Sequence, residues 1–140
     1  MSAAPILVLD TGALLAYAAG HGTVGERLAL ISDINLRAAI PTTCLAEAHR
    51  VLPNKQSELL NVLADHVQVD VNVLTRDDCL FVGHLSRERR LGFGHAVHLA
   101  RATNAMLITD SVDHAQVLLT KRWPIAHPDA IINYDDPFGF

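Results

Sequence analysis

Acidic side chains follow two short apolar runs of this sequence. Asp10 comes directly after the apolar residues 6–9, and Asp110 comes after the run 105–109. A continuous apolar run bounded by turn residues is typical of a strand buried on both faces of a parallel sheet. Binding sites in such proteins lie just outside the carboxyl ends of the strands. We therefore expect both carboxylates to face one crevice, provided that the two strands are neighbours in the sheet.

Two further side chains are expected near the same crevice. Glu47 lies one turn into the helix that follows an expected strand at 38–41, and His95 begins a helix just before the strand that leads to Asp110. Three carboxylates and an imidazole perturb one another unless a cation joins them. We therefore expect Mg²⁺ or Mn²⁺, with Asp10, Glu47 and Asp110 as ligands, because carboxylate oxygens suit these ions. Such an ion activates water and neutralises a phosphodiester, so metal-assisted phosphodiester hydrolysis is the expected chemistry.

The composition is compatible with this chemistry and excludes several other classes of protein. The chain has 140 residues, of which 50% are hydrophobic and 19% are charged. These values predict one globular domain over 1–140, with a core at about 5–127 and a tail at 128–140, and exclude a disordered linker. A net charge of −4 excludes nucleic-acid binding by bulk charge alone. Local binding stays open: Arg87, Arg89 and Arg90 cluster at an expected helix end, where either the helix dipole or contact with RNA accounts for them.

No targeting or membrane segment is expected. The first ten residues contain no basic stretch, and Asp10 interrupts their apolar run, so a signal peptide is not predicted. No apolar segment approaches the length that spans a bilayer. We therefore expect a cytoplasmic protein in which Cys44 and Cys79 are reduced and lie in the core.

Short apolar runs alternate with helical patterns along the chain. This alternation predicts a three-layer α/β/α sandwich with a mainly parallel central sheet. Gly92 and Gly94 are expected to break the chain before His95. Strands are expected at 6–9, 38–41, 67–71 and 105–109 and near Ile125, and helices at 12–19, 26–33, after Thr42 or Thr43, from Pro53, at 75–90, at 95–102 and at 111–121.

Four stretches carry a resemblance to a known family: VLDTGALLAY, IPTTCLAEAHRV, GHAVHLA and LITDSVDHAQVL, in this order. Together they resemble a PIN domain, in particular the VapC-like toxins of type II toxin–antitoxin pairs, over roughly residues 6–125. The resemblance implies a metal-dependent endoribonuclease acting on RNA, a homodimer, and a small antitoxin protein whose arginine enters the acidic crevice. Of the family's three or four acids, Asp10 matches the first and Glu47 the second.

The chain departs from the family pattern at the other two acids. The third acid usually opens a helix as Asp-Ala-x-x-Ala, where this chain has His95. The fourth often lies two residues after the strand-ending threonine, here Thr109, and that place holds Ser111. Asp110 is one residue early, and Asp113 lies within reach if the turn is shifted.

The hydroxyl groups of Thr11, Thr109 and Ser111 are expected to orient a metal ligand or a water molecule.

Two explanations of His95 remain open. Imidazole suits Mn²⁺ better than Mg²⁺, so the site could work with Mn²⁺. Alternatively, protonated His95 pairs with Asp10 and Asp110 and takes the place of the metal. The second explanation favours a catalytically degenerate PIN domain that binds RNA or a protein without cleavage. A metal-dependent DNase or structure-specific nuclease would use the same residues.

Overall fold

A five-stranded, fully parallel sheet forms the centre of the molecule in the computed structural model, which describes residues 4–139. The strand order is β3-β2-β1-β4-β5, so β1 lies in the middle between β2 and β4. This arrangement confirms the predicted α/β architecture with a parallel sheet. The strands are β1 (Leu7–Leu9), β2 (Ala38–Pro41), β3 (Val69–Asn72), β4 (Met106–Ile108) and β5 (Ile125–Ala126).

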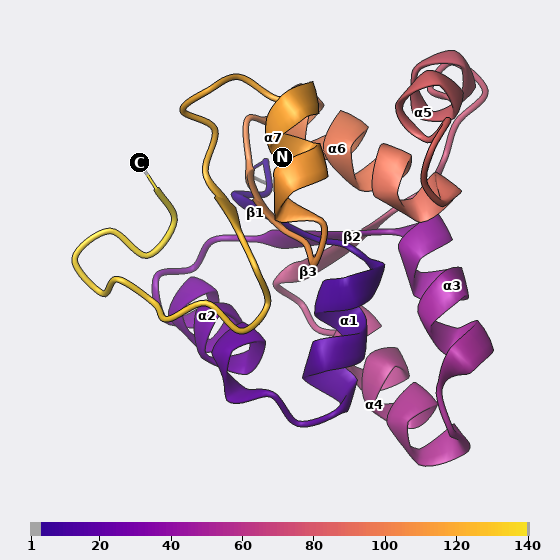
Figure 1. Cartoon of the computed structure of the whole chain (residues 1–140). Helices are drawn as coiled ribbons and strands as arrows, with labels where there is room; N and C mark the ends of the chain where they lie inside the picture. Colours follow the sequence, from indigo (N-terminus) through magenta and orange to yellow (C-terminus); the bar gives the residue numbers. More distant parts are fainter. Residues whose placement is uncertain (1–3, 140) are drawn as a thin grey trace.

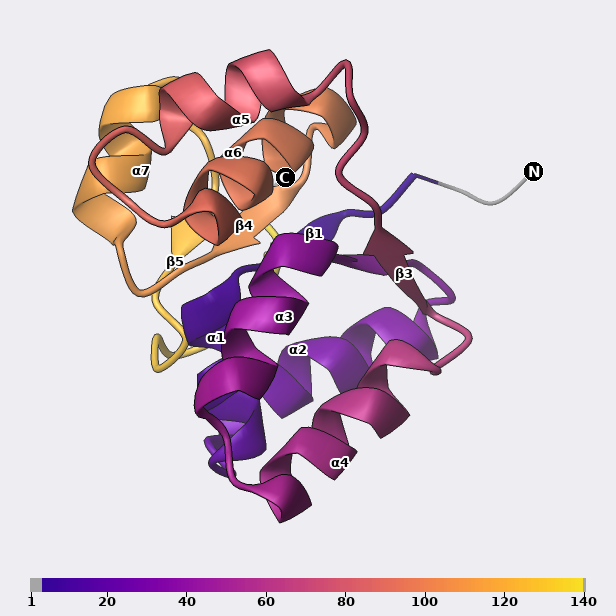
Figure 2. The same ribbon diagram turned by 90° about the vertical axis from the view of Figure 1, so that its right-hand side faces the viewer.

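Helices cover both faces of this sheet. In Figures 1 and 2, α5, α6 and α7 lie on one side of the strands, and α1, α2 and α4 lie on the other. Helix α3 packs against both α1 and α6, so it joins the two layers at the edge of the sheet. The helices are α1 (Thr11–Ala18), α2 (Gly22–Asp33), α3 (Thr42–Val51), α4 (Asn54–Ala64), α5 (Cys79–Leu85), α6 (Leu91–Thr103) and α7 (Val112–Leu118).

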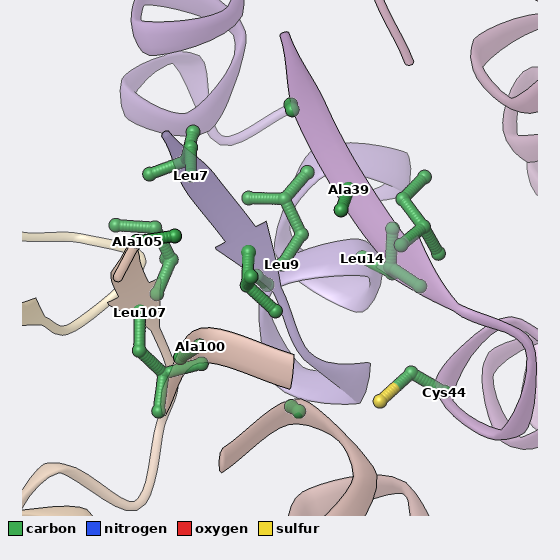
Figure 3. Packing of buried hydrophobic residues seen from close by; sticks show 14 of the residues in the cluster. Leu7, Leu9, Leu14, Ala39, Cys44, Ala100, Ala105 and Leu107 are labelled. Carbon is green, nitrogen blue, oxygen red and sulfur yellow. The ribbon is translucent and has the colours of Figure 1, made fainter. Parts of the chain in front are cut away.

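The core surrounds the central strand. Every residue of β1, β2 and β4 is buried, as the continuous apolar runs predict for strands covered on both faces. Figure 3 shows Leu7 and Leu9 of β1 near Leu107 of β4, with Leu14 of α1 close to Ala39 of β2. This packing fixes the end of β1, after which the chain turns into α1.

The chain around α5 and α6 differs from the sequence-based expectation. Gly92 and Gly94 lie inside α6, which begins at Leu91 and not at His95. A Cβ atom at Gly94 would collide with Ser86 and with the backbone of Val82, so these glycines permit close helix packing and do not break the chain. The expected helix over 75–90 is shorter, since α5 spans only Cys79–Leu85.

The segment after β5 packs against the body of the protein. Ile132 and Phe138 are buried, and the hydroxyl of Tyr134 donates a hydrogen bond of 2.7 Å to Glu26 of α2. Figure 1 shows this segment passing beside α2.

The two cysteines differ in environment. Cys44 is buried as expected, whereas Cys79 is exposed because it begins α5 at the surface.

No helix within residues 4–139 is both long enough and apolar enough to cross a membrane.

Candidate active site

Asp10 lies at the carboxyl end of the central strand. Its backbone N–H donates to the carbonyl of Ile108 at 3.2 Å, which places it beside the end of β4. Its side chain caps α1 by accepting a hydrogen bond of 3.0 Å from the backbone N–H of Ala13. Asp10 is only 3% exposed. It is therefore both a strand-end acid, as predicted, and the N-cap of a helix.

Burial makes ionisation of Asp10 costly. Loss of hydration raises the pKa of its carboxyl group to about 7. Hydrogen bonds from Thr109 and from the backbone at Ala13 lower this pKa in part, and the nearby charge of Asp110 raises it further. A cation next to Asp10 would favour its ionised form.

Asp110 approaches Asp10 from the end of the neighbouring strand. It follows β4 by one intervening residue, Thr109, and is exposed. A Cβ atom built on Gly12 would lie 2.5 Å from the carboxyl carbon of Asp110, so only glycine at this position leaves room for the carboxylate. The backbone N–H of Ser111 donates to the hydroxyl of Thr109 at 3.0 Å and shapes the turn that carries Asp110. The expected meeting of acids from neighbouring strands is therefore present.

Glu47 reaches the same place from α3. The hydroxyl of Thr11 donates to Oε2 of Glu47 at 2.9 Å. The backbone N–H of Gly92, in the first turn of α6, donates to Oε1 at 3.1 Å. These two bonds hold the carboxylate of Glu47 directly beside the residue that follows Asp10.

The three acids share one cavity of about 250 Å³ at the carboxyl ends of β1 and β4. The structure thus brings together Asp10, Glu47 and Asp110, which the sequence pattern singled out. It also adds Arg89 and Arg90 to the wall. The full lining comprises Asp10, Thr11, Gly12, Leu15, Glu47, Arg89, Arg90, Phe93, Asp110 and Ser111.

The oxygen donors of this cavity suit a hard divalent cation, although the side chains do not have the spacing of three ligands around one ion. Asp10 and Asp110 offer carboxylate oxygens, and Mg²⁺ is commonly held by one or two carboxylates with water in the remaining positions. Within residues 4–139, no three His, Cys, Asp or Glu side chains stand at the spacing of a metal site. The cavity therefore offers oxygen donors of the kind that Mg²⁺ prefers, without the three-ligand spacing of a metal site.

His95 does not line this cavity. The imidazole is 1% exposed, and its ring nitrogens contact Thr43 Oγ1 at 2.8 Å and Asn72 Oδ1 at 3.0 Å. With the carbonyl oxygen of Asn72 as acceptor, Nε2 carries the proton and Nδ1 accepts from the hydroxyl of Thr43. Burial lowers the pKa of His95, which favours this neutral ring. The hypothesis that protonated His95 pairs with Asp10 and Asp110 is therefore wrong, because α6 turns its side chain toward β3 and α3.

The remaining predicted residues take different positions. Thr11 and Thr109 contact the acids, as described above, and Ser111 lines the cavity and lies 3.4 Å from Asp110. Asp113 is exposed in the first turn of α7 and lines an adjoining hollow instead. The turn is not shifted, so Asp110 faces the acids and Asp113 does not line their cavity.

Sequence reasoning missed the contribution of Gly92. A Cβ atom there would lie 2.7 Å from Oε2 of Glu47 and 3.0 Å from the hydroxyl of Thr11. The glycine therefore allows α6 to approach α3 and supplies a backbone donor to the acid. Its presence next to Gly94 in the sequence suggested a break in the chain, and nothing in the local pattern distinguishes the two roles.

A larger hollow of about 390 Å³ lies elsewhere, between α1, α2, α4 and β3. Its wall includes Leu28, Leu63 and Val69, and none of the strand-end acids contributes to it. We therefore place the candidate active site at the smaller, acidic cavity.

Comparison with known proteins supports the fold assignment. One similar solved structure is the crystal structure of VapBC2 from Rickettsia felis bound to a DNA fragment from its promoter. The TM-score is 0.64 at 16% sequence identity, and the match covers 86% of this chain and 97% of the other. No protein-family model matches the chain, and no curated protein matches its sequence significantly. The similarity is thus one of fold.

Proposed function

We propose that this protein is a metal-dependent endoribonuclease that hydrolyses RNA phosphodiesters. The observation that carries the proposal is the convergence of Asp10, Glu47 and Asp110 on one cavity at the carboxyl ends of two adjacent parallel strands. The similarity in fold to a chain of VapBC2 adds support. Such a nuclease would act in the cytoplasm.

The side chains of the cavity would have different roles in this reaction. Asp10 and Asp110 would hold Mg²⁺ or Mn²⁺, which lowers the pKa of a bound water and neutralises charge on the phosphodiester. Thr11 and the backbone of Gly92 fix Glu47 with one hydrogen bond on each oxygen. This fixed carboxylate can orient a ligand or accept a proton on that side of the cavity.

Cleavage of single-stranded RNA in Mg²⁺ and in Mn²⁺ tests the proposal. We expect metal-dependent cleavage that is lost in Asp10→Asn, Glu47→Gln and Asp110→Asn. Asp65→Asn is the matched control, because Asp65 is an exposed carboxylate at the end of α4. Equal cleavage by the control and the three site variants would contradict the proposal. Single-stranded and duplex DNA in parallel reactions separate a ribonuclease from a DNase.

We further propose that the protein is the toxin of a toxin–antitoxin pair and forms a homodimer. The solved VapBC2 structure, which the chain resembles in fold, is described as bound to a promoter fragment. A small antitoxin would place an arginine among the acids and occupy the position of the metal. Expression of the wild type alone should arrest growth, whereas Asp10→Asn should not. Light scattering of the purified protein measures the oligomeric state.

A second candidate is a degenerate PIN-like domain that binds RNA or a protein without cleavage. Its support is that no three potential ligands within residues 4–139 stand at metal-site spacing and that His95 is committed to Thr43 and Asn72. Calorimetry with Mn²⁺ and Mg²⁺ distinguishes the candidates. Binding that Asp10→Asn abolishes supports the enzyme, and absence of binding near neutral pH supports the module.

A further inference from the structure

Two exposed arginines stand at the rim of the acidic cavity. Arg89 and Arg90 immediately precede α6 and line the cavity together with Asp10, Glu47 and Asp110. Neither arginine forms an ion pair with another residue in the part of the chain that the structure describes, residues 4–139. Two guanidinium groups therefore lie next to three acids without being neutralised by them.

The arginines also connect the cavity to two further hollows. Arg90 lines a hollow of about 130 Å³ that contains Arg50, and Thr11 and Glu47 belong to both spaces. Arg89 lines a hollow of about 700 Å³, which shares Asp110 and Ser111 with the acidic cavity. We call this series of three hollows the arginine groove. Its order is Arg50 and Arg90, then the acids, then Arg89.

We propose that the arginine groove binds the backbone of a single-stranded RNA, with Arg90 and Arg89 holding the phosphates on either side of the one placed at the acids. This inference rests on the proposed ribonuclease function and assigns residues to substrate binding. Arginine matches the geometry of phosphate with paired donors.

The shape and charge of the groove favour one strand over a duplex. To reach Asp10 a phosphate must enter a cavity of about 250 Å³, and a flexible single strand bends its backbone inward more readily than a stiff duplex does. In the largest hollow, His114 contributes a ring that Phe93 supports edge-on, with their centroids 5.3 Å apart. A base of an unpaired strand can stack on such a ring. Because the whole chain carries a net charge of −4, electrostatic affinity for RNA must come from local cations such as Arg89 and Arg90.

The salt dependence of RNA binding tests this assignment without requiring cleavage. Anisotropy of a short fluorescein-labelled single-stranded RNA, in Ca²⁺ and again in EDTA, gives the affinity at several salt concentrations. For a single strand, the slope of log K against log salt changes by about 0.7 for each phosphate contact. We expect Arg89→Gln and Arg90→Gln each to weaken binding and to reduce the slope by about 0.7. Arg89→Lys and Arg90→Lys should keep the slope, since the charge remains.

Arg87→Gln is the matched control, because Arg87 is exposed in the same arginine cluster and lines none of the three hollows. No measurable RNA binding, unchanged slopes in both glutamine variants, or an equal change in Arg87→Gln would each overturn the inference. So would competition by a polyglutamate peptide as effective as that by unlabelled RNA, because it would indicate an acidic protein segment as the occupant. Arginine-dependent binding without cleavage in any metal would support the groove and refute the ribonuclease. Cleavage of RNA, together with salt slopes that neither arginine substitution changes, would support the ribonuclease and refute the groove.

Discussion

The buried carboxyl group of Asp10 should make the metal-free protein less stable as the pH rises. Its pKa is raised from 3.8 to about 7. Between these two pH values, the folded state therefore holds a proton that the unfolded state has lost. Stability therefore falls from about pH 4 to about pH 7 and is constant above it. Each pKa unit corresponds to about 1.4 kcal/mol, so ionised Asp10 lowers the free energy of unfolding by about 4 kcal/mol at pH 8.

Asp10→Asn removes this cost while keeping the helix cap, because the amide oxygen can still accept the hydrogen bond from Ala13. In EDTA, urea denaturation should show the variant to be about 2–4 kcal/mol more stable than the wild type at pH 8 and nearly equal to it at pH 4. Mn²⁺ should then stabilise the wild type at pH 8 more than it stabilises the variant.

Asp65→Asn provides the control for this comparison, since its exposed side chain should leave the pH profile of stability unchanged. Parallel pH profiles for the wild type and Asp10→Asn would refute the reasoning. So would a variant that is less stable than the wild type at pH 8, because the cap or the hydrogen bond from Thr109 would then outweigh the buried charge.

Three further predictions concern packing and charge pairing, and urea denaturation tests each of them. Gly92→Ala should destabilise the fold by about 1–3 kcal/mol, because the added methyl group would overlap Glu47. Gly25→Ala is the control: a methyl group there meets open space and should stabilise α2 by about 0.5–1 kcal/mol. Equal changes in the free energy of unfolding for the two variants would contradict this account. His95→Ala should cost about 2–3 kcal/mol, because two buried polar partners lose their hydrogen bonds; a neutral result would show that water replaces the ring. The pKa of Asp70 lies below its ordinary value because Arg37 donates hydrogen bonds to it, so Asp70→Asn should cost up to about 1 kcal/mol above pH 4. This cost should decrease as the pH falls from 4 through the lowered pKa, and a loss that persists at the lowest pH would point to another cause.

The sequence alone predicted the sheet and the placement of two residues of the candidate site. Apolar runs such as 6–9 and 105–109 form strands because both of their faces must be buried, and an acid directly after such a run must emerge at the end of a strand. Asp10 and Asp110 were therefore predictable from local pattern. The two residues lie close together because β1 and β4 are neighbours in the sheet, and this pairing arises from contacts between segments nearly a hundred residues apart.

Only the tertiary structure decided which side chains of α6 and its preceding loop face the acids. The local pattern placed His95 at the start of this helix, whereas packing against α3 begins it at Leu91 and brings Gly92 to Glu47. A helix presents a different residue to its partner with every shift of one position. In the observed packing of α6, His95 points toward Asn72, and Arg89 and Arg90 lie at the rim of the cavity. Local sequence thus determined which segments form helices and strands, and the packing of distant segments determined where α6 begins and which side chains meet.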